Sequence, residues 1–153
     1  MPKVIHVVRK FVPSEWGGTE THLVNLVREL SRLGWTSEVH APAEAGTDGS
    51  ALEQAGASFR TYRALYPYWR LDPRQRATLV ASGGNLFSFD EVWRLASDRR
   101  ASIVHTHAIG RLGGVVRLGA RLRGTPYAVT LHGPVRANSE VVRQDVARRA
   151  ATM

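Results

Sequence analysis

Apolar residues along the chain alternate between short β-like runs and longer stretches with helical spacing. The predicted strands are the segments Lys3 to Arg9, Thr36 to Ala41, Ser58 to Tyr62, Ser102 to His107 and Pro126 to His132. Helical stretches separate these strands, so the pattern predicts a parallel sheet with helices on both faces. The expected fold class is therefore α/β, a doubly wound Rossmann-like sheet.

The clearest predicted helix runs from Thr19 to Leu33. Its apolar residues recur at steps of three and four and form one stripe: Leu23, Leu26, Val27, Leu30 and Leu33. Gly34 follows at the position where a left-handed residue commonly ends a helix. This stripe is expected to pack against the sheet.

Further helices follow from their end signals. Ser88 and Glu91 form a capping box that predicts a helix to about Arg99. Its predicted inward residues are Val92, Trp93 and Ala96. The other predicted helical segments are one turn at Ala51 to Gly56, a helix from Gly113 to Leu122 stopped by Gly124 and Pro126, and a last helix capped by Ser139. The segment from Ala64 to Gly84, with Tyr66, Tyr68 and Trp69, has no clear assignment; the aromatic group could stack on a sugar or anchor a loop.

Composition narrows the class of protein. The 153 residues suit one domain, and the lack of cysteine excludes a disulfide framework and a thiolate zinc site. No apolar run approaches the roughly 20 residues of a membrane helix, and the start of the sequence contains no long apolar signal region. The net charge is +8, concentrated from Arg111 onward. This charge indicates either solvated helix faces or attraction to an anionic partner.

Candidate chemistry gathers in the loops after the first, fourth and fifth strands, because Rossmann-like sheets bind ligands beyond the carboxyl ends of their strands. Gly17 and Gly18 allow close approach of the backbone, and the helix start that follows favours anions. Thr19 and Glu20 join this loop as candidate substrate-binding residues. The structural alternatives are Thr19 as a helix cap and Glu20 as an acid at the helix N-terminus.

Histidines end the fourth and fifth strands. His105 and His107 are two apart and share a face of their strand. A metal site would require a further ligand, for which His132 is available. The alternatives are a structural role for His105 and a substrate contact for His107. His132, followed by Gly133, is expected to face the cleft and to form a hydrogen bond with a substrate oxygen.

Two stretches carry a resemblance to a known family: HVVRKFVPSEWGGTETHLVNLVRELSRLGW and IVHTHAIGRLGGVVRLGARLRGTPYAVTLHG. They resemble the N-terminal half of retaining, GT-B-fold glycosyltransferases of the glycosyltransferase family 4-like, glycogen-synthase-like group. The resemblance spans about residues 3–134, with only pattern agreement from about 45 to 100. Gly34-Trp35 departs from the Gly-His pair that often follows the first long helix in this group.

The resemblance implies a transferase that moves a sugar from a nucleotide-diphosphate sugar to a sugar or lipid-linked acceptor. Gly17 and Gly18 would approach the donor, His132 would lie beside the reacting sugar as the catalytic residue, and His107 and Gly133 would contact substrate. No metal or other cofactor is required in this group, because protein cations and helix dipoles stabilise the leaving diphosphate.

The resemblance also implies that residues 1–153 form one acceptor-side domain without the C-terminal donor-binding domain. We expect the chain to be inactive alone, with a donor domain in trans or a second copy as possible partners. A cytoplasmic location is expected, with possible contact between the arginine-rich end and an anionic membrane. The alternatives are a generic nucleotide-binding Rossmann protein and a basic nucleic-acid-binding module; the latter is disfavoured because Tyr127 is the only aromatic residue after Arg111.

Overall fold

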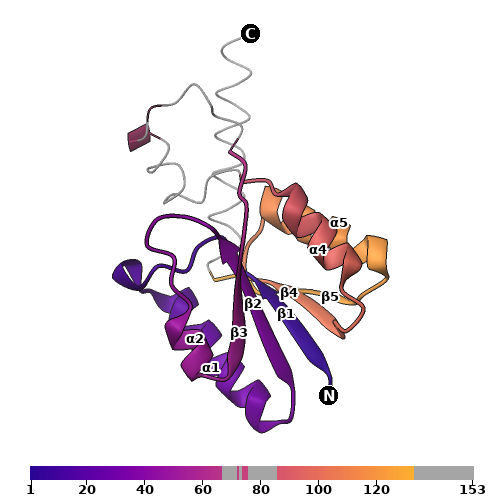
Figure 1. Ribbon diagram of the computed structural model, residues 1–153. Coiled ribbons are helices and arrows are strands. Elements are labelled where there is room, and N and C mark those ends of the chain that lie inside the picture. Colours follow the sequence, from indigo (N-terminus) through magenta and orange to yellow (C-terminus); the bar gives the residue numbers. More distant parts are fainter. Residues whose placement is uncertain (67–71, 73, 76–85, 133–153) are drawn as a thin grey trace.

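The computed structural model describes residues 1–66, 72, 74–75 and 86–132, and its core is a five-stranded sheet of order β3-β2-β1-β4-β5 (Figure 1). The strands are β1 (Lys3–Val7), β2 (Thr36–Pro42), β3 (Ala57–Tyr62), β4 (Ile103–Thr106) and β5 (Tyr127–Val129). Every pair of neighbours is parallel. The order reverses at β1, so the predicted doubly wound α/β fold is confirmed.

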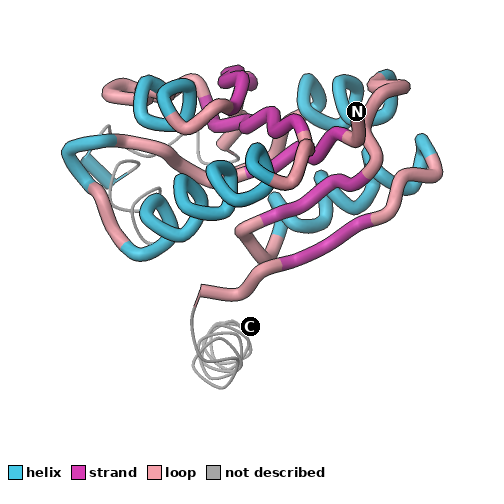
Figure 2. The backbone as a smooth tube through the Cα atoms, turned by 90° about the horizontal axis from the view of Figure 1, so that it is seen from below, coloured by secondary structure: helices cyan, strands magenta, loops and turns pink. Residues whose placement is uncertain are grey.

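Helices cover both faces of this sheet (Figures 1 and 2). The described helices are the 3-10 turn η1 (Pro13–Glu15), α1 (Gly18–Arg32), α2 (Ser50–Gln54), α4 (Phe89–Ser97) and α5 (Arg111–Arg123). No helix in the described part of the chain is long and apolar enough to cross a membrane.

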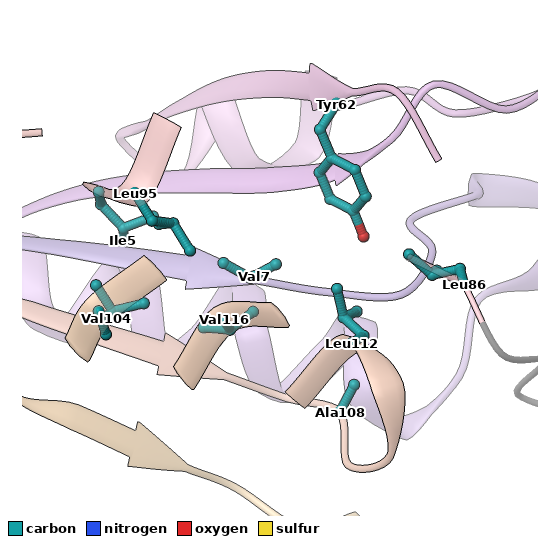
Figure 3. Packing of buried hydrophobic residues seen from close by; sticks show 10 residues of the cluster. Ile5, Val7, Tyr62, Leu86, Leu95, Val104, Ala108, Leu112 and Val116 are labelled. Atoms are coloured by element: carbon teal, nitrogen blue, oxygen red, sulfur yellow. The ribbon is translucent and has the colours of Figure 1, made fainter. Parts of the chain in front are cut away.

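The sheet separates two hydrophobic clusters. The first cluster lies between one face of the sheet and the helices α1 and α2. Its buried members are Val8, Phe11, Leu23, Val24, Val27, Val39, Ala41, Leu52, Ala55 and Ala57. Residues on the other face pack with α4 and α5: Ile5, Val7, Tyr62, Leu86, Leu95, Val104, Ala108, Leu112, Val116 and Ala120 (Figure 3). Alternation along β1 therefore directs Ile5 and Val7 to the second cluster and His6 to the side of α1.

Helix α1 confirms the strongest prediction from the sequence. Leu23, Val24 and Val27 are buried along its inner face. Leu33 is 74% exposed, so its predicted place in the packed stripe is wrong. The reason is that the helix ends one residue earlier, at Arg32, and Gly34 turns the chain away with a φ of +79°.

Helix α4 begins as predicted, because the Ser88 hydroxyl accepts a hydrogen bond from the Glu91 backbone N–H at 3.1 Å. The predicted inward position of Trp93 is wrong, since this side chain is 75% exposed. Glu91 and Leu95, one helical turn apart, instead face the core. Gly119 of α5 lets the two helices approach closely, because a Cβ there would lie 2.7 Å from the Leu95 Cβ.

The last described helix and strand follow their predicted signals in part. Gly124 ends α5 in the left-handed conformation, with φ +75°. Strand β5, an edge strand of the sheet (Figure 2), is shorter than predicted and pairs with β4 along Tyr127–Val129. Tyr68, Trp69 and the helix expected after Ser139 lie outside the described residues.

A buried ionic network links β2 to α4. His40 is 1% exposed and lies between two carboxylates, 2.7 Å from Glu91 Oε1 and 2.8 Å from Glu38 Oε1. Lys3 Nζ lies 2.7 Å from Glu38 and 2.8 Å from Asp98. Burial opposes the charged imidazole, but the two carboxylates raise the pKa of His40 overall. The same contacts, led by the hydrogen bond to His40, lower the pKa of Glu38 to about 2.

We predict that His40→Gln lowers the free energy of unfolding by about 3–5 kcal/mol near pH 6, because it leaves the buried carboxylate of Glu91 without its cation, whereas Glu38 keeps Lys3 and Arg60. The stabilisation by His40 is present below its ordinary pKa of 6.5 and is lost as the pH rises through the raised folded value. The deficit of the variant should therefore shrink in alkaline buffer. Urea unfolding of both proteins at pH 6 and pH 9 measures it.

The matched control is Arg60→Ala, because Arg60 joins Glu38 at 2.8 Å from an exposed position. This change should alter the free energy of unfolding by less than about 1 kcal/mol. Equal losses in the two variants would contradict a special role for the buried imidazole.

Candidate functional site

A cavity of about 200 Å³ opens at the carboxyl end of β1, where the chain turns into α1. Its walls come from the end of β1, from η1, from the first turn of α1 and from the residue after β4. The lining residues are Val8, Arg9, Lys10, Glu15, Gly17, Gly18, Thr19, Glu20 and His107. Its position at the carboxyl edge beside β1, where the strand order reverses, is the usual ligand position in this type of fold.

The glycine turn forms the mouth of α1. Gly17 is the N-cap residue and has extended backbone, with φ −143°. The Gly17 N–H donates to Glu20 Oε2 at 3.0 Å, and the Thr21 hydroxyl donates to the Gly17 carbonyl. Glu20 is therefore an acid that contacts the helix N-terminus, which was the structural alternative to a substrate-binding role. Thr19 is not the cap, because the helix already begins at Gly18.

Gly18 has no packing reason to be glycine. A Cβ built at this position would meet nothing within 4 Å, and the residue does not have positive φ. A Cβ at Gly17 would lie 3.3 Å from Glu20 Oε2, which is a tight contact. The space at Gly18 therefore leaves the backbone of the first helical turn accessible from the cavity.

Two bases, Arg9 and Lys10, and two acids, Glu15 and Glu20, line the cavity together with the start of α1. The backbone N–H groups of the first turn of a helix have no partner within the helix, and the helix dipole places positive charge there. Arg9 lines the same cavity and forms no ion pair with the described residues. Lys10 pairs with Glu15, which lines the same cavity. Arg9 and the start of α1 are therefore the groups available to contact a phosphate or another small anion.

Histidines continue the site from the cavity toward β5. His107 Nδ1 lies 3.1 Å from His132 Nε2, and the two rings are stacked with centroids 5.4 Å apart. The ring of His22, on α1, packs edge-on against His132 at 5.1 Å. On the inner side, His107 Nε2 lies 3.4 Å from His6 Nδ1. His105, whose Nε2 lies 2.7 Å from Thr130 Oγ1, completes the cluster.

Burial keeps the inner members of this cluster neutral. Desolvation, reinforced by neighbouring histidines, lowers the pKa of His6 to about 3 and that of His107 to about 2. The pKa of His105 and that of His132 are lowered for the same reason. At neutral pH these rings are therefore uncharged hydrogen-bonding groups, each with one donor and one acceptor nitrogen.

The structure brings together most of the residues that the sequence singled out. Gly17, Gly18, Thr19, Glu20 and His107 line one cavity, and His132 contacts His107 at its border. Gly133 lies outside the described residues. The sequence analysis missed His6 and His22. His6 lies in the middle of a buried strand and His22 on a helix, so only the tertiary arrangement shows that they face the strand-end histidines.

Comparison with known proteins identifies the family. The glycosyl transferase 4-like domain family matches residues 17–153, which is most of the chain. The chain belongs to this family. No curated protein matches it.

A solved structure supports the same fold. The crystal structure of MurG from Acinetobacter baumannii matches with a TM-score of 0.53 and 15% sequence identity. The match covers 90% of this chain and 38% of the MurG chain, so this chain spans well under half the length of that protein. At this identity the similarity establishes the fold, which is one half of a GT-B arrangement.

We predict that the histidine cluster makes the domain acid-sensitive. The pKa of His107 is about 2 in the folded chain and 6.5 ordinarily. The contribution of neutral His107 to the free energy of unfolding is therefore fully present above pH 6.5 and is lost as the pH falls below that value. Between pH 7 and pH 5 the free energy of unfolding should fall by about 2 kcal/mol less in His107→Gln than in the wild type. Urea titrations in chelator-containing buffer at the two pH values measure the difference. Parallel losses in both proteins would contradict this account.

Proposed function

We propose that this chain is the acceptor-side domain of a glycosyltransferase that moves a sugar from a nucleotide-diphosphate sugar to an acceptor. Membership of the glycosyl transferase 4-like family supplies the class of reaction. The observation that carries the proposal is the convergence of the Gly17–Gly18 turn, His107 and His132 at one cavity. The generic nucleotide-binding and nucleic-acid-binding alternatives have no comparable support.

Each part of the site has a role in the proposed transfer. The first turn of α1, exposed beside Gly18, would contact the donor phosphates through backbone N–H groups. His132 would hydrogen-bond to an oxygen of the reacting sugar, while His107 fixes the orientation of its ring. In the reaction the bond between C1 and the diphosphate oxygen breaks, a bond from C1 to the acceptor oxygen forms with retention of configuration, and the acceptor hydroxyl gives its proton to the leaving diphosphate. Helix dipoles and basic side chains would stabilise the leaving diphosphate without a divalent ion.

The proposed reaction requires a second domain. The chain spans 38% of the MurG chain that it matches. We infer that a donor-binding domain, in the same polypeptide, in trans or from a second copy, completes the site. Without it, purified chain should not consume a nucleotide-diphosphate hexose, and steady turnover in that assay would contradict the inference.

A sugar or lipid-linked acceptor is part of this proposal, as is a cytoplasmic location at the inner membrane surface. The support is charge: residues from Arg111 onward carry eight arginines against two acids. Co-sedimentation with vesicles should therefore increase with the content of anionic lipid. Equal sedimentation with neutral vesicles would contradict the membrane contact while leaving the sugar-transfer proposal intact.

We predict that Gly18→Val strongly weakens the binding of a phosphorylated sugar without destabilising the fold. The Cβ of the added side chain meets nothing within 4 Å, and the side chain occupies the approach to the helix start. Glucose 1-phosphate, titrated into ¹⁵N-labelled wild-type chain, should shift the amide signals of residues 17–20. Its affinity for the variant should be at least about tenfold lower. Thermal unfolding checks that the variant is folded.

The matched control is Gly114→Ala, a helical glycine on α5 whose added Cβ also meets nothing within 4 Å. It should bind the probe as the wild type does. Shifts confined to the arginines of α5, or equal binding by Gly18→Val, would contradict the assignment of the cavity.

A further inference from the structure

The parallel sheet brings three histidines together on the face of α1. His6 and His105 are direct partners in the pairing of β1 with β4, and His107 follows two residues later on the same side. One ring nitrogen from each lies within 4.8 Å of the other two. Among the described residues, only this group combines enough ligands at such distances for a metal ion.

The distance between two of these nitrogens fits a tetrahedral ion. His6 Nδ1 and His107 Nε2 are 3.4 Å apart. Two imidazole nitrogens bound tetrahedrally at 2.0–2.1 Å from zinc are also about 3.4 Å apart. The same distance is longer than the usual range of a good hydrogen bond. His105 would need a small ring movement to complete the set, and it is only partly buried.

In two of these three histidines, the ring nitrogen that would not bind the metal already has a hydrogen-bond partner. His105 Nε2 lies 2.7 Å from Thr130 Oγ1, and His107 Nδ1 lies 3.1 Å from His132 Nε2. Metal-binding histidines usually have such a partner on the second nitrogen, which fixes the tautomer and the ring orientation. The rings also carry free lone pairs at neutral pH, because burial lowers the pKa of His6 and that of His107.

We propose that His6, His105 and His107 form a binding site for a divalent transition-metal ion such as Zn²⁺. The fourth position is left to water from the cavity that His107 borders. The ion joins β1 to β4 at the switch point of the sheet, and none of its protein ligands belongs to the Gly17–Gly18 turn. This ligand set differs from the one that the sequence suggested, in which His132 was the third ligand. In the structure His132 instead contacts the second ring nitrogen of His107, Nδ1.

The test uses the full chain without a histidine tag, stripped with chelator and titrated with Zn²⁺ and Co²⁺ at pH 7.5. We expect one ion per chain, a higher melting temperature with metal, and the visible absorption of tetrahedral cobalt. His6→Gln and His105→Gln should each weaken Zn²⁺ binding by more than about tenfold. Thr130→Val should weaken it by about tenfold, because it removes only the partner of His105.

The matched control is His22→Gln, since His22 belongs to the same cluster of rings but not to the ligand set. It should bind Zn²⁺ as tightly as the wild type. If His6→Gln does not fold, His105→Gln and Thr130→Val decide the question. Loss of binding in His22→Gln with unchanged binding in His105→Gln would indicate an exposed chelate and overturn the proposal, as would failure of the wild type to bind. These outcomes are independent of the sugar-phosphate titration.

Discussion

The parallel pairing of β1 with β4 is the constraint on which the rest of this domain depends. Its register places His6 opposite His105 and brings the loop after β1 next to the residues that follow β4. Because both strands point the same way, the glycine turn at α1 and His107 end at one edge and enclose one cavity. A shift of the register by one residue would turn the histidines of one strand to the opposite face and dissolve the cluster.

The pKa of a buried histidine is shifted in opposite directions on the two faces of the sheet. On the side of α4, carboxylates of Glu38 and Glu91 hold His40 in its charged form and raise its pKa. On the side of α1, His6 and His107 lie against other histidine rings, and desolvation lowers the pKa of His6 and that of His107. The first arrangement joins β2 to α4 as a structural ion network. The second keeps neutral lone pairs beside a ligand cavity, which suits hydrogen bonding or metal binding.

The glycine turn shows how a site can be recognised by what packing leaves unexplained. Gly119 and Gly124 have structural reasons, a close helix contact and a left-handed backbone. Gly18 has neither, yet it stands at the mouth of a 15-residue helix beside Arg9 and Lys10. Family membership and this local geometry point to the same edge of the sheet, although they rest on different observations.

Local pattern was enough for the existence and order of the strands, for the limits of α1 to within one residue at each end, and for the meeting of Gly17, Gly18 and His107. Periodicity, capping residues and strand direction act over short stretches, so the sequence reveals them. It failed for Trp93 and Leu33, whose exposure depends on what the neighbouring elements cover. It also gave no sign of His6, His22 or the buried His40–Glu91 pair. These contacts join residues as many as 101 positions apart, so only the packing of complete elements against one another creates them.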